Sequence, residues 1–177
     1  MIIGLTGKIG SGKGEVVNYL KTKGYEHYVY SDVIREIAKQ RGIEPTRANL
    51  QRLGFEIKRK KGYGVLSSIL LKKAKTQNAV FDGIRNRYEI NELRKKNTLI
   101  IGVTASPKVR FERIRKRNRK GDPKTYHEFK RLDNIENRGK TIGQEINHCL
   151  TMADNIIDNN STLVELHKKI DAIISRK

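Results

Sequence analysis

The stretch of residues 7–14 constrains the fold of this chain more than any other part of its sequence. It reads Gly-Lys-Ile-Gly-Ser-Gly-Lys-Gly, follows the short apolar run 2–6, and precedes residues 15–20, which have the pattern of a helix. Glycines let backbone N–H groups converge on an anion without interference from Cβ atoms, and the N-terminus of the following helix adds its dipole. A strand, a glycine-rich turn with a lysine and a helix form the context that a phosphate-binding P-loop requires. The sequence therefore predicts a nucleotide-binding loop.

The residue after the loop lysine departs from the usual P-loop pattern. Lys13 can reach the outer phosphates of a nucleotide as a point charge. The next position usually carries a Ser or Thr hydroxyl that ligates magnesium, but here it is Gly14. We expect the phosphates of ATP to be bound by Gly7, Lys8, Ile9, Gly10, Ser11, Gly12, Lys13 and Gly14.

The length and composition favour one compact domain. A chain of 177 residues is long enough to bury a full core. No charged and apolar leader precedes the first strand pattern at Met1, and no apolar run is long enough to cross a membrane. Cys149 is the only cysteine, which excludes an intramolecular disulfide and a cysteine zinc cluster. We expect a cytoplasmic monomer or small homo-oligomer with no membrane contact.

The formal net charge of +19 points to polyanionic partners, either nucleotides or nucleic acid. The charge is concentrated in residues 52–61 and, most heavily, in residues 110–140. Abundant surface lysine without a specific partner is the alternative explanation. The composition alone leaves both explanations open.

Strand and helix patterns alternate along the whole chain. Short apolar runs occur at residues 2–6, 28–30, 79–81, 99–103 and 156–157, with helical segments between them. Nearly all-apolar strands that alternate with helices predict an α/β fold, in which a parallel sheet of about five strands carries helices on both faces. Ligands of such sheets bind at the carboxyl ends of the strands. The polar residues that follow each strand are therefore the candidates for chemistry.

Several helices have recognisable start signals. Asn86 and Glu89 have the spacing of a capping box, and Ser106 precedes Pro107 as a capping residue before a proline at the first helical position. The basic stretch 110–119 reads as a continuation of that helix, and Gly-Asp-Pro at 121–123 predicts a turn before the next one. Apolar residues at helical spacing predict a last helix within residues 163–174.

An acid and an arginine recur after two strands that lead to the same edge of the sheet as the P-loop. Asp32 and Arg35 follow the second strand, whereas Asp82, Gly83 and Arg85 follow the third.

These motifs resemble those of a known family. The Gly-Lys-Gly of residues 12–14, the Asp-x-x-Arg of residues 32–35 and the Asp-Gly of residues 82–83 resemble adenylate kinases. The opening residues 3–13 are similar to those of dephospho-coenzyme A kinases. Along nearly its full length the chain most resembles an archaeal group of adenylate-kinase-related P-loop proteins, in which Asp-Pro-Lys-Thr, here residues 122–125, is typical after a basic helix.

The resemblance implies a three-layer P-loop kinase fold with two accessory parts. The segment of about residues 117–140 would form a basic helical lid, and about residues 31–76 would bind the phosphoryl acceptor. In this lid Arg117 and Arg131 are the arginines that we expect to neutralise the transferring phosphate.

The resemblance also implies roles around the phosphates. Lys13 would act in catalysis, and Arg35, with Gly83 and Arg85, would bind the acceptor. The family arginine lies four residues after the aspartate, whereas Arg85 lies three residues after it and Arg87 five, so either could take that part. Asp82 would hold Mg²⁺, through water, since Gly14 lacks a hydroxyl and magnesium accepts a water-rich shell. Asp32 would be either a catalytic base or the group that orients Arg35.

Three functions are consistent with these residues. The first is an ATP-dependent phosphotransferase that acts on a nucleoside monophosphate such as AMP, with Mg²⁺ as cofactor. The second is a dephospho-coenzyme A kinase, in which Asp32 would activate a hydroxyl acceptor. The third is an RNA-associated P-loop ATPase that uses the basic surface.

Overall fold

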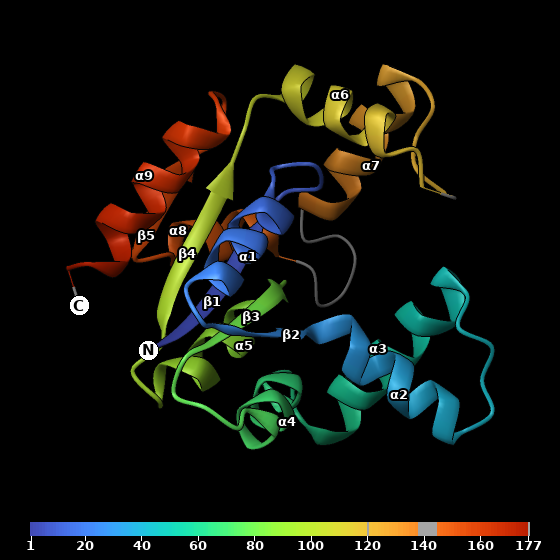
Figure 1. The fold of residues 1–177 in the computed structure, drawn as a ribbon. Helices are drawn as coiled ribbons and strands as arrows, with labels where there is room; N and C mark the ends of the chain where they lie inside the picture. The colour runs from blue at the N-terminus through green and yellow to red at the C-terminus, as the bar shows by residue number, and fades with distance from the viewer. Residues whose placement is uncertain (120, 138–144, 177) are drawn as a thin grey trace.

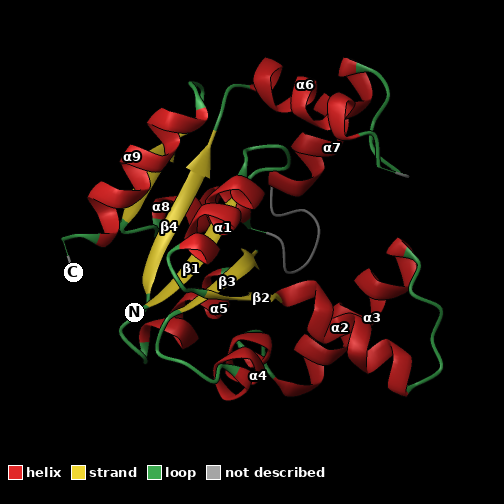
Figure 2. Cartoon of the chain, in the orientation of Figure 1, coloured by secondary structure: helices red, strands yellow, loops and turns green. Residues whose placement is uncertain are grey.

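A five-stranded sheet forms the centre of the molecule, and all of its strand pairings are parallel. The computed structural model describes residues 1–119, 121–137 and 145–176. The strand order is β2-β3-β1-β4-β5, which confirms the predicted α/β fold (Figure 2). The strands are β1 (Ile2–Gly7), β2 (Glu26–Val29), β3 (Ala79–Ile84), β4 (Leu99–Thr104) and β5 (Asn155–Asp158).

The helices of the described residues connect these strands and cover the sheet (Figure 1). They are α1 (Lys13–Thr22), α2 (Tyr30–Gln40), α3 (Arg47–Lys61), α4 (Val65–Lys73), α5 (Arg87–Arg94), α6 (Pro107–Arg117), α7 (Tyr126–Asn137), α8 (Ile146–Thr151) and α9 (Leu163–Ile174). None of them is long and apolar enough to cross a membrane.

Each face of the sheet has its own apolar core, because successive side chains of a strand point to opposite faces. In β3, Val80 packs with residues of α1 and α9, whereas its neighbours Ala79 and Phe81 pack with residues of α2, α3, α4, α5 and α8. The alternation divides the helices into two layers around the sheet. The structure thus confirms the three-layer arrangement that the motifs implied.

The predicted helix starts are present. Asn86 and Glu89 form a capping box at α5, and the Ser106 hydroxyl accepts a hydrogen bond from the backbone N–H of Val109 at α6. The last helix, α9, spans residues 163–174, as its apolar spacing predicted.

Several boundaries differ from those predicted, among them the ends of β2, β3 and α6. The second strand ends at Val29 instead of residue 30, because Tyr30 is the first residue of α2. The hydroxyl of Tyr30 lies 2.6 Å from the Oγ atom of Ser67 in α4. The third strand continues to residue 84, because Thr6 of β1 still pairs with it after a register shift. Helix α6 ends two residues before position 119, since Asn118 adopts a left-handed conformation with φ 42°.

The loop between β1 and α1 lies between two helical groups. Helices α6 and α7 lie at the top of Figure 1, and α2 and α3 lie at its lower right. Helix α7 and the last residue of α6 belong to the segment of about residues 117–140 predicted as a lid, of which residues 120 and 138–140 lie outside the described residues. Helices α2 and α3 belong to the segment predicted to bind the acceptor.

Candidate active site

Two glycines of the phosphate-binding loop have left-handed backbone conformations and no room for a Cβ atom. Gly7 ends β1 with φ 151°, and a Cβ atom there would lie 2.3 Å from the carbonyl oxygen of Val103 in β4. Gly12 precedes α1 with φ 99°, and a Cβ atom there would lie 2.1 Å from the Nδ2 atom of Asn159. The loop therefore passes close to two neighbouring segments, and its backbone turns into the N-terminus of α1, where helical N–H groups favour an anion.

Lys13 curls back over this loop. Its ammonium donates hydrogen bonds to the carbonyl oxygens of Gly7, at 2.7 Å, and Lys8, at 3.3 Å. A phosphate oxygen is a stronger partner for an ammonium than a neutral carbonyl is, because both partners then carry charge. When a nucleotide binds, the ammonium of Lys13 can therefore leave these carbonyl oxygens and bind the phosphates instead.

The side-chain position after Lys13 is open. Gly14 is exposed, and no atom lies within 4 Å of the place that a Cβ atom would occupy. The missing magnesium-ligating hydroxyl is therefore not a consequence of crowding.

Asp82 is an acid that lines the same cavity as Lys13. It lies within β3, opposite Leu5 of β1 and Val29 of β2, and so belongs to the strand instead of following it. Its Oδ1 atom is buried and accepts no hydrogen bond among the described residues. Its Oδ2 atom lies 3.9 Å from Nε2 of His27, whose pKa is lowered, chiefly by burial.

A neutral His27 leaves the charge of the Asp82 carboxylate uncompensated by that contact. A carboxylate with an unsatisfied buried oxygen beside a phosphate-binding loop fits a hydrated Mg²⁺. Among the described residues there is no cluster of three His, Cys, Asp or Glu side chains that could hold a metal by itself. The phosphates of the nucleotide would have to supply the remaining ligands.

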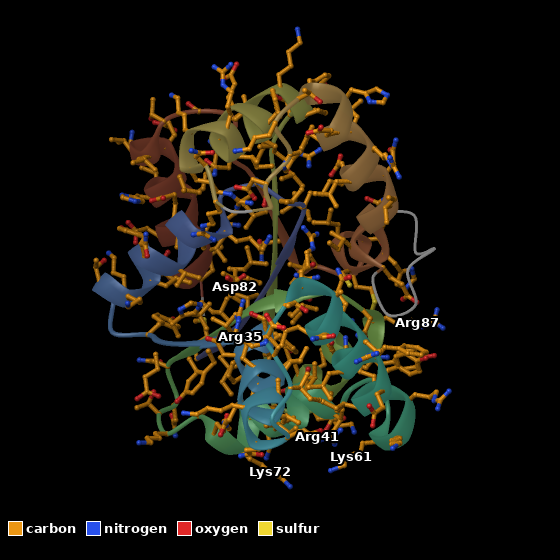
Figure 3. The ribbon with its side chains drawn as sticks, turned by 90° about the vertical axis from the view of Figure 1, so that its right-hand side faces the viewer. Arg35, Arg41, Lys61, Lys72, Asp82 and Arg87 are labelled. Atoms are coloured by element: carbon orange, nitrogen blue, oxygen red, sulfur yellow. The ribbon has the colours of Figure 1, made fainter. Side chains whose placement is uncertain are left out.

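A cavity of about 930 Å³ extends from Lys13 and Asp82 toward α2 and α3. In Figure 3 Asp82 and Arg35 lie near the middle of the molecule, whereas Lys61 and Lys72 lie at its lower edge. The lining combines cations, two acids and apolar side chains: Lys13, Val29, Tyr30, Ser31, Ile34, Arg35, Pro45, Arg47, Leu50, Gln51, Gly54, Phe55, Lys58, Leu66, Asp82, Gly83, Arg85 and Glu89.

The two charged residues of the Asp-x-x-Arg motif are hydrogen-bonded to each other, but only the arginine lines the cavity. Arg35 lines the cavity and donates to the Ser31 hydroxyl at 2.7 Å and to Oδ1 of Asp32 at 2.8 Å. Asp32 does not line the cavity, and its side chain is 64% exposed. Of the two roles open to Asp32, the geometry provides the contact that orients Arg35.

The segment after β3 brings Gly83 and Arg85 to the cavity. The guanidinium of Arg87 instead stacks on the ring of Tyr88, 5.0 Å from its centroid, and Arg87 is not part of the lining. Of the two arginines, the one three residues after the aspartate is therefore the one that lines the cavity.

The sequence predicted no ligand-binding role for two further residues of the cavity, Lys58 and Glu89. Lys58 of α3 is buried and forms an ion pair of 2.8 Å with the buried Glu89. The lysine was one of many in a basic run, and the glutamate was predicted only as a cap. Lys58 lies one helical turn after Gly54 and beside Ile57, on the buried face of its helix, and that spacing is the signal that could have singled it out.

The predicted lid arginines do not line the cavity in this structure. Arg117 forms two hydrogen bonds of 2.8 Å with the carboxylate of Asp122, and this contact holds the pKa of Asp122 below its ordinary value. Arg131 is exposed. Arg113 donates to the carbonyl oxygens of Ser11 and Asn159, so it braces the phosphate-binding loop from outside.

One basic residue of α6 is not part of a solvated face. Arg110 is 2% exposed and forms two hydrogen bonds of 2.7 Å with the carboxylate of Asp133 in α7. The same guanidinium donates to the carbonyl oxygen of Ile9 at 3.2 Å and lies 5.0 Å from the centroid of the Phe129 ring. Arg110 thus joins α7 to the phosphate-binding loop.

Comparisons with known proteins agree with this geometry. A family described as AAA domain matches residues 3–139. A UPF0200 protein of Pyrococcus horikoshii is 34% identical to this chain, over 99% of it and 97% of the relative. A UPF0200 protein of Sulfurisphaera tokodaii is 35% identical, over 99% of this chain and 96% of the relative.

Solved structures with the same fold include kinases of small molecules. The shikimate kinase of Aquifex aeolicus has a TM-score of 0.57 at 19% identity, over 99% of this chain and 96% of that one. A gluconokinase of Sinorhizobium meliloti has a TM-score of 0.57 at 16% identity, over 98% of this chain and 91% of that one. At these identities the likeness establishes the P-loop kinase fold and no substrate.

Proposed function

We propose a function from one premise: this chain belongs to the AAA domain family, together with the archaeal UPF0200 proteins. The proposed activity is transfer of the γ-phosphate of ATP to a nucleoside monophosphate such as AMP. The observation that carries the proposal is one cavity that contains both the loop lysine, Lys13, and the arginines Arg35 and Arg85. Donor and acceptor phosphates can meet there.

Phosphoryl transfer asks a protein chiefly to position its substrates and to neutralise charge. Lys13 would bind the outer phosphates of ATP at the N-terminus of α1. Arg35 and Arg85 would bind the phosphate of the acceptor, since a guanidinium matches two phosphate oxygens at once. Apolar cavity residues such as Leu50 and Phe55 would pack against its base.

The place of Asp32 favours a phosphate acceptor over a hydroxyl acceptor. A monophosphate attacks through an oxygen that is already anionic and needs no base, whereas the hydroxyl of dephospho-coenzyme A benefits from a positioned carboxylate. Asp32 lies outside the cavity lining and hydrogen-bonds to Arg35. This arrangement supports the monophosphate as the acceptor.

Magnesium would be held by Asp82 through water and by the phosphates themselves. Bound there, Mg²⁺ would neutralise negative charge on the transferring phosphoryl group. The unsatisfied Oδ1 atom of Asp82 supports this role, and Gly14 adds no ligand.

An assay of ADP formation from ATP and Mg²⁺ tests the proposal. The acceptors are AMP, GMP, CMP, UMP and dephospho-coenzyme A, each compared with a reaction that lacks an acceptor. We expect at least one monophosphate to raise ADP formation, and Lys13→Met to lower the rate at least 100-fold because phosphate charge then stays uncompensated. Lys61→Met removes an exposed lysine of α3 and is the matched control.

Turnover of dephospho-coenzyme A alone, with a large loss in Asp32→Asn, would replace the proposed acceptor by a hydroxyl. ADP formation that no acceptor raises above the background would refute the nucleotide kinase activity altogether.

A further inference from the structure

Lys58 is a buried cation of the acceptor cavity for which the proposed transfer has no use. Its side chain is 10% exposed, and its Nζ atom lies 2.8 Å from Oε1 of Glu89, whose side chain is 1% exposed. Both residues line the cavity, although they come from α3 and α5. A buried ion pair is expensive to desolvate and adds little stability compared with apolar packing, so its presence in a ligand cavity calls for a reason.

Glu89 is held in place from several sides. Its Oε2 atom accepts hydrogen bonds from the backbone N–H groups of Arg85, at 2.8 Å, and Asn86, at 3.3 Å. Its backbone carbonyl accepts one from the Ser67 hydroxyl at 2.9 Å. The Oε1 atom consequently has a fixed position, and it fixes the ammonium of Lys58.

An ammonium has three N–H donors, and Glu89 takes one of them. Lys58 also lines the cavity, so its other two donors can reach a ligand there. Because the glutamate cancels its charge, the pair attracts a phosphate weakly and acts as a hydrogen-bond donor at a fixed place. Such a donor suits an uncharged acceptor atom of a ligand. Arg35 differs, because its side chain is half-exposed and can adjust its position to that of a phosphate.

We propose that Lys58, held by Glu89, is a specificity residue that donates a hydrogen bond to a ring nitrogen or carbonyl oxygen of the acceptor's base. The inference rests on the proposed function, since it assumes that a nucleoside monophosphate occupies the cavity. Lys58 would hydrogen-bond to the base, whereas Arg35 and Arg85 would bind the phosphate.

The test compares binding of two kinds of probe. The four nucleoside monophosphates carry a base, whereas ribose 5-phosphate has the same sugar phosphate without one. The double variant Lys58→Met with Glu89→Gln removes the donor and leaves no buried charge, and the glutamine oxygen can still cap α5. Lys61→Met, on the exposed side of the same helix, is the control.

Calorimetry should show that the wild-type protein binds at least one monophosphate more tightly than ribose 5-phosphate. For that monophosphate the double variant should lose about 10- to 100-fold in affinity, the usual effect of one hydrogen bond to a charged donor, whereas its affinity for ribose 5-phosphate should change less than about twofold. Lys61→Met should leave both affinities unchanged.

Equal losses for both probes, or no loss for either, would overturn the inference. If the double variant does not fold, Lys58→Arg keeps the ion pair but moves the donors, and the same selective loss is required of it. Wild-type protein that binds no monophosphate would instead overturn the proposed function, and this inference with it. Wild-type protein that binds both probes equally would overturn the inference alone.

Discussion

At the scale of single residues, the two ends of the phosphate-binding loop differ in what they tolerate. Gly7 has a carbonyl oxygen where its Cβ atom would lie, whereas Gly14 faces open space in the first turn of α1. In the sequence Gly7 fits the usual P-loop pattern, whereas Gly14 departs from it by replacing a Ser or Thr. The first glycine is required by the neighbouring strand, and the second is required by nothing in the described structure.

Substitutions at these two glycines should therefore have opposite effects on stability. Gly14→Ser should be stabilised by about 0.5 kcal/mol, since serine costs less than glycine in a helix. Its hydroxyl should also lower, severalfold, the Mg²⁺ concentration that half-saturates the ADP-forming reaction. Gly7→Ala should lose at least about 2 kcal/mol of unfolding free energy through the clash with Val103. Urea unfolding and a magnesium titration measure these effects, and a Gly7→Ala variant as stable as the wild type would contradict the steric argument.

At the scale of elements, helix α6 forms two ion pairs in different surroundings, and one of them joins it to α7. The pair of Arg110 and Asp133 is buried between the helices and reaches the phosphate-binding loop through the carbonyl of Ile9. The second pair joins Arg117, the last residue of α6, to Asp122 in the turn before α7, and it is partly exposed. Because burial, and not charge, sets the cost of losing a partner, the two pairs should respond unequally to mutation.

Asp133→Asn should lower the free energy of unfolding by about 3–5 kcal/mol, because it leaves the guanidinium of Arg110 buried without a counter-charge. Arg117→Gln should cost less than about 1 kcal/mol, since solvent screens its pair. The double variant Arg110→Met with Asp133→Leu should be more stable than Asp133→Asn. Urea unfolding compares the three, and equal losses in Asp133→Asn and Arg117→Gln would show that burial does not separate the pairs.

At the scale of the whole molecule, the single cysteine reports on the integrity of the core. Cys149 of α8 is fully buried against the sheet, and burial raises the pKa of its thiol to about 12 from an ordinary value of 9.0. The folded protein therefore keeps a proton that the unfolded chain loses between these two values. Stability that depends on this thiol is complete below about pH 9 and declines as the pH rises toward 12.

Two measurements follow from the buried thiol. At pH 8 a disulfide reagent should label native protein far more slowly than urea-unfolded protein, because the native thiol is neither exposed nor ionised. Between pH 9 and pH 10.5, the unfolding free energy of Cys149→Ala should fall less steeply than that of the wild type. Rapid labelling of the native protein, or equal slopes in the two proteins, would contradict the burial of this thiol.

Local patterns in the sequence were enough to predict much of this molecule. The phosphate-binding loop, the parallel sheet and the caps at Asn86 and Ser106 all depend on residues close together in the chain. Their physical causes are equally local: backbone conformation at glycine, alternation of side chains along a strand, and hydrogen bonds within one helical turn. The strand order and the extension of β3 to Ile84 depended instead on pairing between distant segments.

The roles of the charged residues were decided by the tertiary structure. Residue type alone does not distinguish Arg110 or Lys58 among the 38 lysines and arginines of the chain, and the helical spacing of Lys58 indicates at most that it lies on a buried face. Their partners, Asp133 and Glu89, lie 23 and 31 residues away in the chain, and each pair is buried where two helices meet. What a charge does depends on its burial and on its partner, and both are properties of the folded chain. The sequence alone determined that this protein has a loop for phosphates, and only the fold decided which cations and acids surround it.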